Sequence, residues 1–149
     1  MADLKSSLMA DIKSAMKSGD KPRLGVLRLI SAAIKQREVD ERIELTDADI
    51  ISVLDKMSKQ RRESIAQYES ANRDDLAAVE RSELDIIAQY LPAALSADEI
   101  DTLISDAISE TGASGIRDMG KVMGLLKPKL QGRADMAAVS AQIKDRLNA

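Results

Sequence analysis

Apolar side chains recur along most of the chain at intervals of three or four residues, the spacing that gathers them on one face of an α-helix. The first apolar stripe covers residues 4–15, and Gly19 ends it. Pro22 suits the first turn of a second helix, whose apolar stripe covers residues 24–34. The two stripes predict a pair of amphipathic helices, the second of which fades between residues 40 and 44.

The next segment combines a strong helix start with an unusual polar stretch. Thr46 and Asp49 have the spacing of a capping box, with Asp in place of the usual Glu, and predict a third helix that continues to about Tyr68. Its predicted buried face lies within positions 50–57, the residues from Ser58 to Ser64 include no apolar one, and apolar positions resume at Ile65 and Tyr68. Such a stretch is typical of a solvated helix surface or of a helix that bridges two parts of a protein.

Four more helices follow from candidate caps and breaks. Asn72 can cap the fourth helix, and Pro92 stops it because the residue before a proline avoids the helical conformation. The last three helices begin at the candidate N-caps Ser96, Asp118 and Asp135. Pro128 is expected to kink or shorten the sixth helix.

These periodicities predict an all-α protein, since no segment shows the sustained alternation that marks a strand. We expect an N-terminal helical domain of four helices over residues 1–92 and a C-terminal domain of three helices over residues 96–149. The boundary lies where the stop at Pro92 is followed at once by a new cap at Ser96.

Composition excludes several kinds of chemistry. Neither Cys nor His occurs among the 149 residues, so disulfides, Cys/His zinc sites and catalytic triads that need His are all absent. The formal net charge is -3, whereas nucleic-acid binders usually carry a basic excess. Any nucleic-acid site must therefore be a local patch. We expect no cofactor and no metal.

The expected location is the cytoplasm. The first 17 residues alternate charged with apolar side chains, which is unlike a signal peptide, and no apolar run approaches the length of a membrane span. We therefore also expect no membrane partner.

A basic segment from Arg117 to Arg133 is the first candidate site. It contains one acid and five cations: Arg117, Lys121, Lys127, Lys129 and Arg133. Gly120 and Gly124 lie four residues apart on one helical face, where each costs up to about 1 kcal/mol relative to Ala. Glycines at this spacing indicate either close packing of a neighbouring helix or close approach of a ligand, and both interpretations stay open.

Two further basic stretches lie in the N-terminal part. Residues 21–37 hold five cations and no acid, with Arg28 and Lys35 on one face. The polar stretch of the third helix adds more, so we define a secondary basic surface that comprises Arg28, Lys56, Lys59 and Arg61. The simpler interpretation is a solvated surface, and the functional one is a contact for phosphate or for an acidic partner.

Glu80 and Glu83, three residues apart on the fourth helix, could serve as an acid and a base or as metal ligands. An enzyme built on them would also draw on Lys56, Lys59 and Tyr68, with strongly shifted pKa values. We favour a salt link from these carboxylates to Arg61 or Arg73.

Several strings resemble a known family. They are VLRLI at residues 26–30, KMSKQRRESIAQY at 56–68, NRDDL at 72–76, ERSELDIIAQYLP at 80–92, DMGKVMG at 118–124 and GRAD at 132–135. Together they resemble the YqeY-like family, also called GatB/YqeY domain proteins, over nearly the whole chain.

The resemblance implies a C-terminal domain similar to the tail of the B subunit of the tRNA-dependent amidotransferase, a glutamine-dependent carbon–nitrogen ligase. That tail contacts tRNA, so residues 120–124 and 132–135 become the candidate tRNA surface. The subunit's catalytic parts have no counterpart here. We therefore expect an accessory tRNA-binding protein that is not catalytic alone. The alternative is a protein–protein interaction module without RNA binding.

Overall fold

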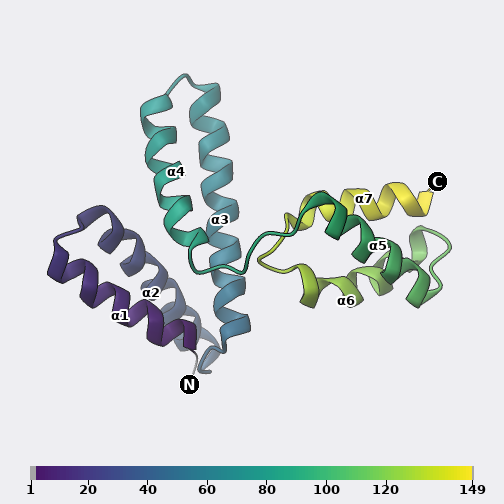
Figure 1. Cartoon of the computed structure of the whole chain (residues 1–149), viewed down its shortest axis with the longest axis horizontal. Helices are drawn as coiled ribbons and strands as arrows, with labels where there is room; N and C mark the ends of the chain where they lie inside the picture. Colours follow the sequence, from purple (N-terminus) through teal and green to yellow (C-terminus); the bar gives the residue numbers. More distant parts are fainter. Residues whose placement is uncertain (1–2, 149) are drawn as a thin grey trace. The chain divides into compact units, whose positions relative to one another are not determined.

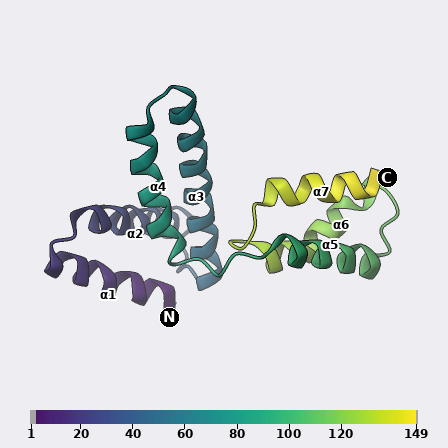
Figure 2. The same ribbon diagram turned by 45° about the horizontal axis from the view of Figure 1, so that its top comes forward.

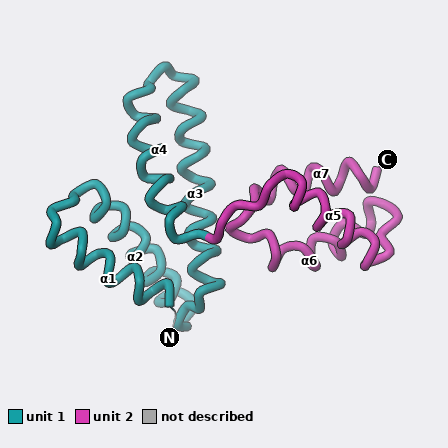
Figure 3. The backbone as a smooth tube through the Cα atoms, viewed as in Figure 1, with its two compact units in different colours: residues 1–91 teal, residues 92–149 magenta. Residues whose placement is uncertain are grey.

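The computed structural model describes residues 3–148 and confirms the all-α prediction. These residues form seven α-helices and one short 3-10 helix, and the described part of the chain contains no strand (Figure 1). The chain separates into two compact units, residues 1–91 and residues 92–149 (Figure 3).

Unit 1 consists of two antiparallel helical hairpins. Its helices are α1 (Asp3–Ser18), α2 (Lys21–Glu41), α3 (Asp47–Ser70) and α4 (Asp74–Ala88). Figures 1 and 2 show α1 beside α2 and α3 beside α4, each pair joined by a tight turn. The core is aliphatic; its fully buried large side chains include Leu8, Leu27, Ile30, Leu45, Ile50, Leu54 and Ile87.

The start of α3 confirms the capping box. The backbone N–H of Asp49 donates to Thr46 Oγ1 at 3.3 Å, and the N–H of Thr46 donates to Asp49 Oδ2 at 3.0 Å. The pKa of Asp49 is lowered first by the bond from the Thr46 N–H and next by the Thr46 hydroxyl, which also donates to Asp49 Oδ2. Two otherwise unpaired N–H groups are satisfied in this way, so the helix begins where the sequence predicts.

The turn between α3 and α4 differs from the prediction. Asn72 does not cap α4: its φ is +58°, in the left-handed region, and it lies in the turn after α3. Arg73 takes the N-cap position instead, and its side chain makes no capping bond to the helix backbone. The reason is that Asn tolerates the left-handed conformation better than most residues, so it can reverse the chain direction here.

The polar stretch of α3 is solvated only in part: Lys59, Gln60, Arg62 and Glu63 are exposed, but the side that faces α4 is covered. Ser58 is only 2% exposed, and Arg61 turns toward α4. Both lie on the same helical face as Leu54 and Met57. The face of α3 that is apolar near its start therefore becomes polar further along the helix. The distal parts of α3 and α4 face each other through these groups.

Unit 2 is a three-helix arrangement. It contains α5 (Ala97–Thr111), the 3-10 helix η1 (Ile116–Asp118), α6 (Met119–Leu130) and α7 (Met136–Asn148). Figure 2 shows the three α-helices side by side. Its separate core is again aliphatic, with the buried side chains Ile104, Ala107, Val122, Leu126, Leu130, Val139, Ile143 and Leu147.

Two of the three caps predicted in unit 2 form as expected. Ser96 Oγ accepts from the N–H of Glu99 at 3.1 Å, and Asp135 Oδ1 accepts from the N–H of Ala137 at 3.0 Å. Asp118 does not cap α6, because its carboxylate accepts from the N–H of Ser114 at 3.0 Å. That bond is the main reason why the pKa of Asp118 is lowered. Asp118 therefore closes the loop before η1.

Candidate nucleic-acid interface

Helix α6 has a buried face and an opposite face that carries the two glycines. Val122, Leu126 and Leu130 are fully buried in the unit 2 core, whereas Gly120 and Gly124 are exposed. At 3.6 residues per turn, Lys121 and Lys127 flank Gly124 by about 60° on either side. We call this surface, made of Gly120, Lys121, Gly124 and Lys127, the α6 glycine face.

Neither glycine of this face is required by local packing. A Cβ atom at either position would meet no heavy atom within 4 Å outside the helix's own nearby backbone, and neither residue has a positive φ. Close packing of a neighbouring helix, one of the two explanations that the sequence left open, is therefore wrong. Alanine would fit and would stabilise the helix by up to about 1 kcal/mol. The bare backbone is open to another molecule.

In the part of the chain that the structure describes, neither lysine of the face forms an ion pair, although the charge of Lys121 helps to lower the pKa of the nearby Asp118. Within residues 3–148, no ion pair or side-chain hydrogen bond involves Lys121 or Lys127. Arg117 is exposed in η1, directly before α6, and is likewise unpaired in this part of the chain. Lys129 is exposed but lies about 140° around the helix from Gly124. The structure thus gathers two of the five predicted cations around the glycines.

Arg133 has a structural task at the other end of α6. Its Nε donates to the carbonyl of Ala93 at 3.1 Å, and its own carbonyl accepts from the N–H of Leu95 at 2.9 Å. The side chain also lines an open cavity of about 460 Å³ with Asp98 and Glu99. Because Arg133 is hydrogen-bonded to residues at the start of unit 2, its side chain is less available to bind phosphate than an unpaired arginine would be.

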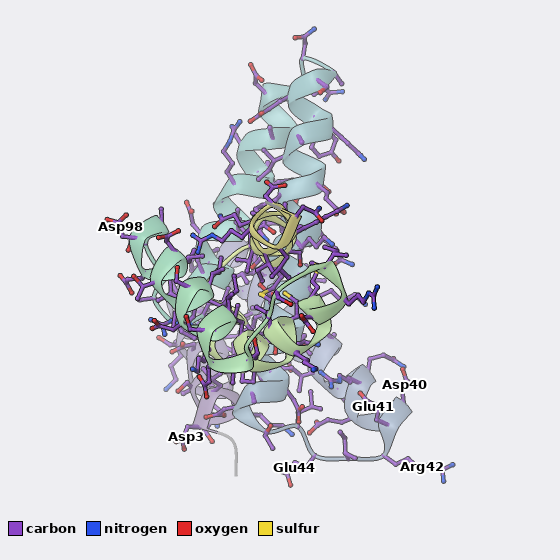
Figure 4. All side chains as sticks on the ribbon, turned by 90° about the vertical axis from the view of Figure 1, so that its right-hand side faces the viewer. Asp3, Asp40, Glu41, Arg42, Glu44 and Asp98 are labelled. Carbon is purple, nitrogen blue, oxygen red and sulfur yellow. The ribbon has the colours of Figure 1, made fainter. Side chains whose placement is uncertain are left out.

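Charge is segregated between the helices of unit 2. Helix α5 carries five acidic residues and no Lys or Arg, and α6 carries three Lys and no acid. Asp98 projects from the first turn of α5 (Figure 4). A unit that contains many acids therefore still presents one basic helix, which explains how a chain of net charge -3 can offer a surface to phosphate.

The secondary basic surface of unit 1 does not form one patch. Arg61 is a correction to the sequence prediction: its side chain is 16% exposed and lies against α4. Lys56 lines a groove between α2 and α3, together with Arg37, and Lys59 is exposed on α3. Lys56 and Lys59 are both exposed on α3, whereas Arg28 is exposed on α2.

Comparisons with known proteins decide the family. A model of the family described as "Yqey-like protein" matches residues 5–147. The chain belongs to the YqeY-like family. A fungal relative from Pyrenophora tritici-repentis, named "Altered inheritance of mitochondria protein 41, mitochondrial", is 34% identical over 146 residues. That match covers 95% of this chain and 80% of the relative.

Two further relatives carry the same name. The protein of Lachancea thermotolerans is 30% identical and matches 95% of this chain and 79% of its own length. The protein of Meyerozyma guilliermondii is 36% identical over 81% of this chain and 65% of its own length. The expected cytoplasmic location is contradicted by these relatives, which are named as mitochondrial proteins. The pattern of charged and apolar residues in the first 17 positions could not distinguish the cytoplasm from mitochondria.

In this YqeY-like protein, Glu80 and Glu83 form the predicted link to Arg61. Arg61 Nε lies 2.9 Å from Glu83 Oε2 and 3.5 Å from Glu80 Oε2. Arg73 pairs instead with Asp75, its neighbour in the first turn of α4. Both glutamates are thus shared by one guanidinium. No group of three or more Asp or Glu residues that could hold a metal ion occurs within residues 3–148.

Tyr90, in the Tyr-Leu-Pro string, belongs to a polar cluster that no sequence pattern predicted. The hydroxyl of Tyr90 donates to Asp11 Oδ2 at 2.5 Å and accepts from Arg23 at 3.0 Å. Tyr90 is 8% exposed, and burial, followed by the bond to Asp11, raises its pKa to about 12. The cluster joins α1, α2 and the residues after α4. It stabilises unit 1 and has no reactive geometry.

No helix in the described range, residues 3–148, is long and apolar enough to cross a membrane. The exposed large apolar side chains are Met9, Met16, Leu29, Val39, Ile43, Val79 and Ile116. All but Ile116 belong to unit 1.

Proposed function

We propose that this YqeY-like protein is an accessory tRNA-binding protein without catalytic activity of its own, related to the tail of the amidotransferase B subunit. The α6 glycine face is the contact surface, with Arg117 at its edge. The observation that carries the proposal is the pair of exposed glycines, which nothing within unit 2 requires, flanked by two unpaired lysines.

The physical argument concerns distance and charge. Without side chains at Gly120 and Gly124, the sugar–phosphate backbone can approach the helix closely enough for van der Waals contact. Lys121 and Lys127 then reach phosphates on either side of that contact. Phosphate contacts of this kind fix a protein on RNA without reading the sequence of bases. The face therefore suits the body of a folded RNA, whose backbone is the exposed part.

A titration of the full chain with total tRNA tests the proposal, with fluorescence anisotropy as the readout. We expect binding that weakens steeply as salt rises, because bound cations displace counterions from phosphate. Lys121→Gln combined with Lys127→Gln should weaken binding about tenfold at low salt, since two phosphate contacts are lost. The charge-matched control is Lys17→Gln combined with Lys144→Gln, two exposed positions outside the face.

Gly124→Leu separates contact from folding. Leucine favours helix over glycine by up to about 1 kcal/mol and has open space at this position, so the variant should be at least as stable as the parent protein. Its tRNA affinity should nevertheless fall, because the side chain holds the backbone of the RNA away. Absence of tRNA binding by the parent protein at low salt would overturn the proposal.

The alternative function, a protein–protein interaction module, has one observation in its favour. An open groove of about 670 Å³ runs between α2 and α3 and carries both charges, with Arg37 and Lys56 as cations and Asp40 and Glu41 as acids. Asp40 and Glu41 project near the turn between these helices (Figure 4). Affinity capture with and without ribonuclease distinguishes the functions: partners that persist after ribonuclease, in the absence of RNA, favour this one.

A further inference from the structure

Helix α2 carries a row of cations on its outward face. Lys21, Arg28 and Lys35 follow one another at intervals of seven residues, which is nearly two helical turns, so the row drifts by only about 20° per step. All three are exposed, while Leu27, Ile30 and other side chains of the opposite face are buried in the unit 1 core. The three positions span about 21 Å along the helix.

These cations are distinguished from the other two of α2 by what they contact. Arg23 donates to Gln89 at 2.7 Å and to the Tyr90 hydroxyl at 3.0 Å, and Arg37 pairs with Glu41 and Asp49. By contrast, no ion pair or side-chain hydrogen bond within residues 3–148 involves any member of the row.

The row has no evident role in folding. Residues 21–37 contain no acid, although the chain has 25 acids against 22 basic residues. Lys21 stands in the first turn of α2, where the helix dipole disfavours a cation. Neighbouring members are about 10.5 Å apart, which is close to the screening length at physiological salt, so their mutual repulsion is tolerated but stabilises nothing.

Small residues lie beside the row. Gly25 and Ala32 form a parallel line about 60° around the helix and are exposed, and a Cβ atom at Gly25 would meet nothing within 4 Å. This is the same combination of open backbone and unpaired cations that marks the α6 glycine face. It occurs once in each unit.

We propose that this outward face of α2, the α2 cation row with Gly25 and Ala32 beside it, is a second surface for the sugar–phosphate backbone of RNA. The choice of RNA rests on the proposed function. Three cations in line over about 21 Å match a linear polyanion, whereas a single phosphate group would require cations that converge.

An anionic membrane is the main rival, and the apolar residues argue against it. A helix that lies in a membrane interface needs a broad apolar face toward the lipid. The apolar face of α2 is already buried in the unit 1 core, and the outward side offers only Leu29 and Val39 as large apolar residues, 51% and 64% exposed.

The test measures tRNA affinity of the full chain over a range of salt. In the row variant, Lys21→Gln, Arg28→Gln and Lys35→Gln are combined. We expect affinity to fall about tenfold or more at low salt, and the slope of log K against log salt to flatten by about 2 to 3, as for three lost phosphate contacts. The helix content of the variant, from circular dichroism, should be unchanged because the three side chains make no hydrogen bond or ion pair within residues 3–148.

The matched control changes the same charge at three exposed cations elsewhere in unit 1: Lys13→Gln, Lys17→Gln and Arg62→Gln. It should lose much less affinity and keep nearly the parent slope. If the row variant behaves like this control, the inference is overturned, and the proposed function still stands provided that the α6 variant weakens binding.

The remaining outcomes separate the two proposals. If the row variant loses affinity while Lys121→Gln with Lys127→Gln loses none, the α2 surface is supported and the proposed role of α6 falls. If the parent protein does not bind tRNA but binds vesicles of equal parts phosphatidylcholine and phosphatidylglycerol through the row, both are overturned in favour of a membrane contact. Loss of affinity in both variants, with near-complete loss when they are combined, supports both surfaces.

Discussion

Replacing Arg61 by methionine removes the only guanidinium that faces Glu80 and Glu83 in the described structure, and we expect it to destabilise unit 1 clearly. The length of the side chain is roughly kept, so the change is mainly one of charge. After it, two carboxylates on the same face of α4 remain near each other against the middle of α3. Neither gains another cation.

The expected size of the effect follows from burial. The three side chains of the cluster are 16%, 21% and 27% exposed for Arg61, Glu80 and Glu83 respectively. Exposed ion pairs contribute about 0–1 kcal/mol, whereas breaking a fully buried pair costs about 3–5 kcal/mol. A mostly buried cluster that keeps some solvent lies between these values, so the loss should be about 2–3 kcal/mol. For a unit of this size that corresponds to a fall in Tm of roughly 10–20 °C.

Equilibrium unfolding in urea, followed by circular dichroism, measures this loss. A companion variant adds Glu80→Leu and Glu83→Leu to Arg61→Met, which turns the cluster apolar. It should recover most or all of the lost stability, since apolar replacement of a buried charge cluster is often neutral or stabilising. A loss below about 0.5 kcal/mol in Arg61→Met, or no recovery in the companion, would show that the cluster is solvated and that its burial was misjudged.

Three smaller predictions follow from single groups. Ser58→Ala should stabilise unit 1 by about 1 kcal/mol in the same urea assay, because the Ser58 hydroxyl is 2% exposed and has no hydrogen-bond partner. In a Tyr68→Phe protein, where Tyr90 is the remaining tyrosine, absorbance at alkaline pH should show ionisation near pH 12 when folded and near pH 10 in urea. Because the folded pKa of Tyr90 is the higher one, its contribution to stability is complete below pH 10 and disappears between about pH 10 and 12, a loss that Tyr90→Phe should not show. Gly124→Ala should raise the Tm of unit 2 by a few degrees, whereas a decrease would mean that the glycine is needed for folding.

Capping and periodicity determine the local structure of this chain well because they act over a few residues. The Thr46–Asp49 box starts α3, and Ser96 starts α5, as predicted. The prediction that Asn72 caps α4 was wrong. Asn suits both an N-cap and a left-handed turn, and the local sequence does not show which of the two will form. Which one forms depends on how α3 and α4 pack.

The candidate site was predictable in composition but not in arrangement. The sequence pattern placed Gly120 and Gly124 on one face, yet only the structure shows that this face is turned to solvent. The structure also shows that Arg61 pairs with Glu83 and that Arg133 forms hydrogen bonds with Ala93 and Leu95. Contacts between residues far apart in the sequence therefore decide which charged side chains stay unpaired.

By itself, then, the sequence determined the helices, most of their caps and the absence of Cys and His. Those properties depend on residue type and on spacings of a few residues. Which cations stay unpaired, and whether the glycines of α6 are covered, was decided only by the tertiary structure. The physical reason is that ion pairing and burial depend on contacts between residues far apart in the chain, which helical periodicity does not encode.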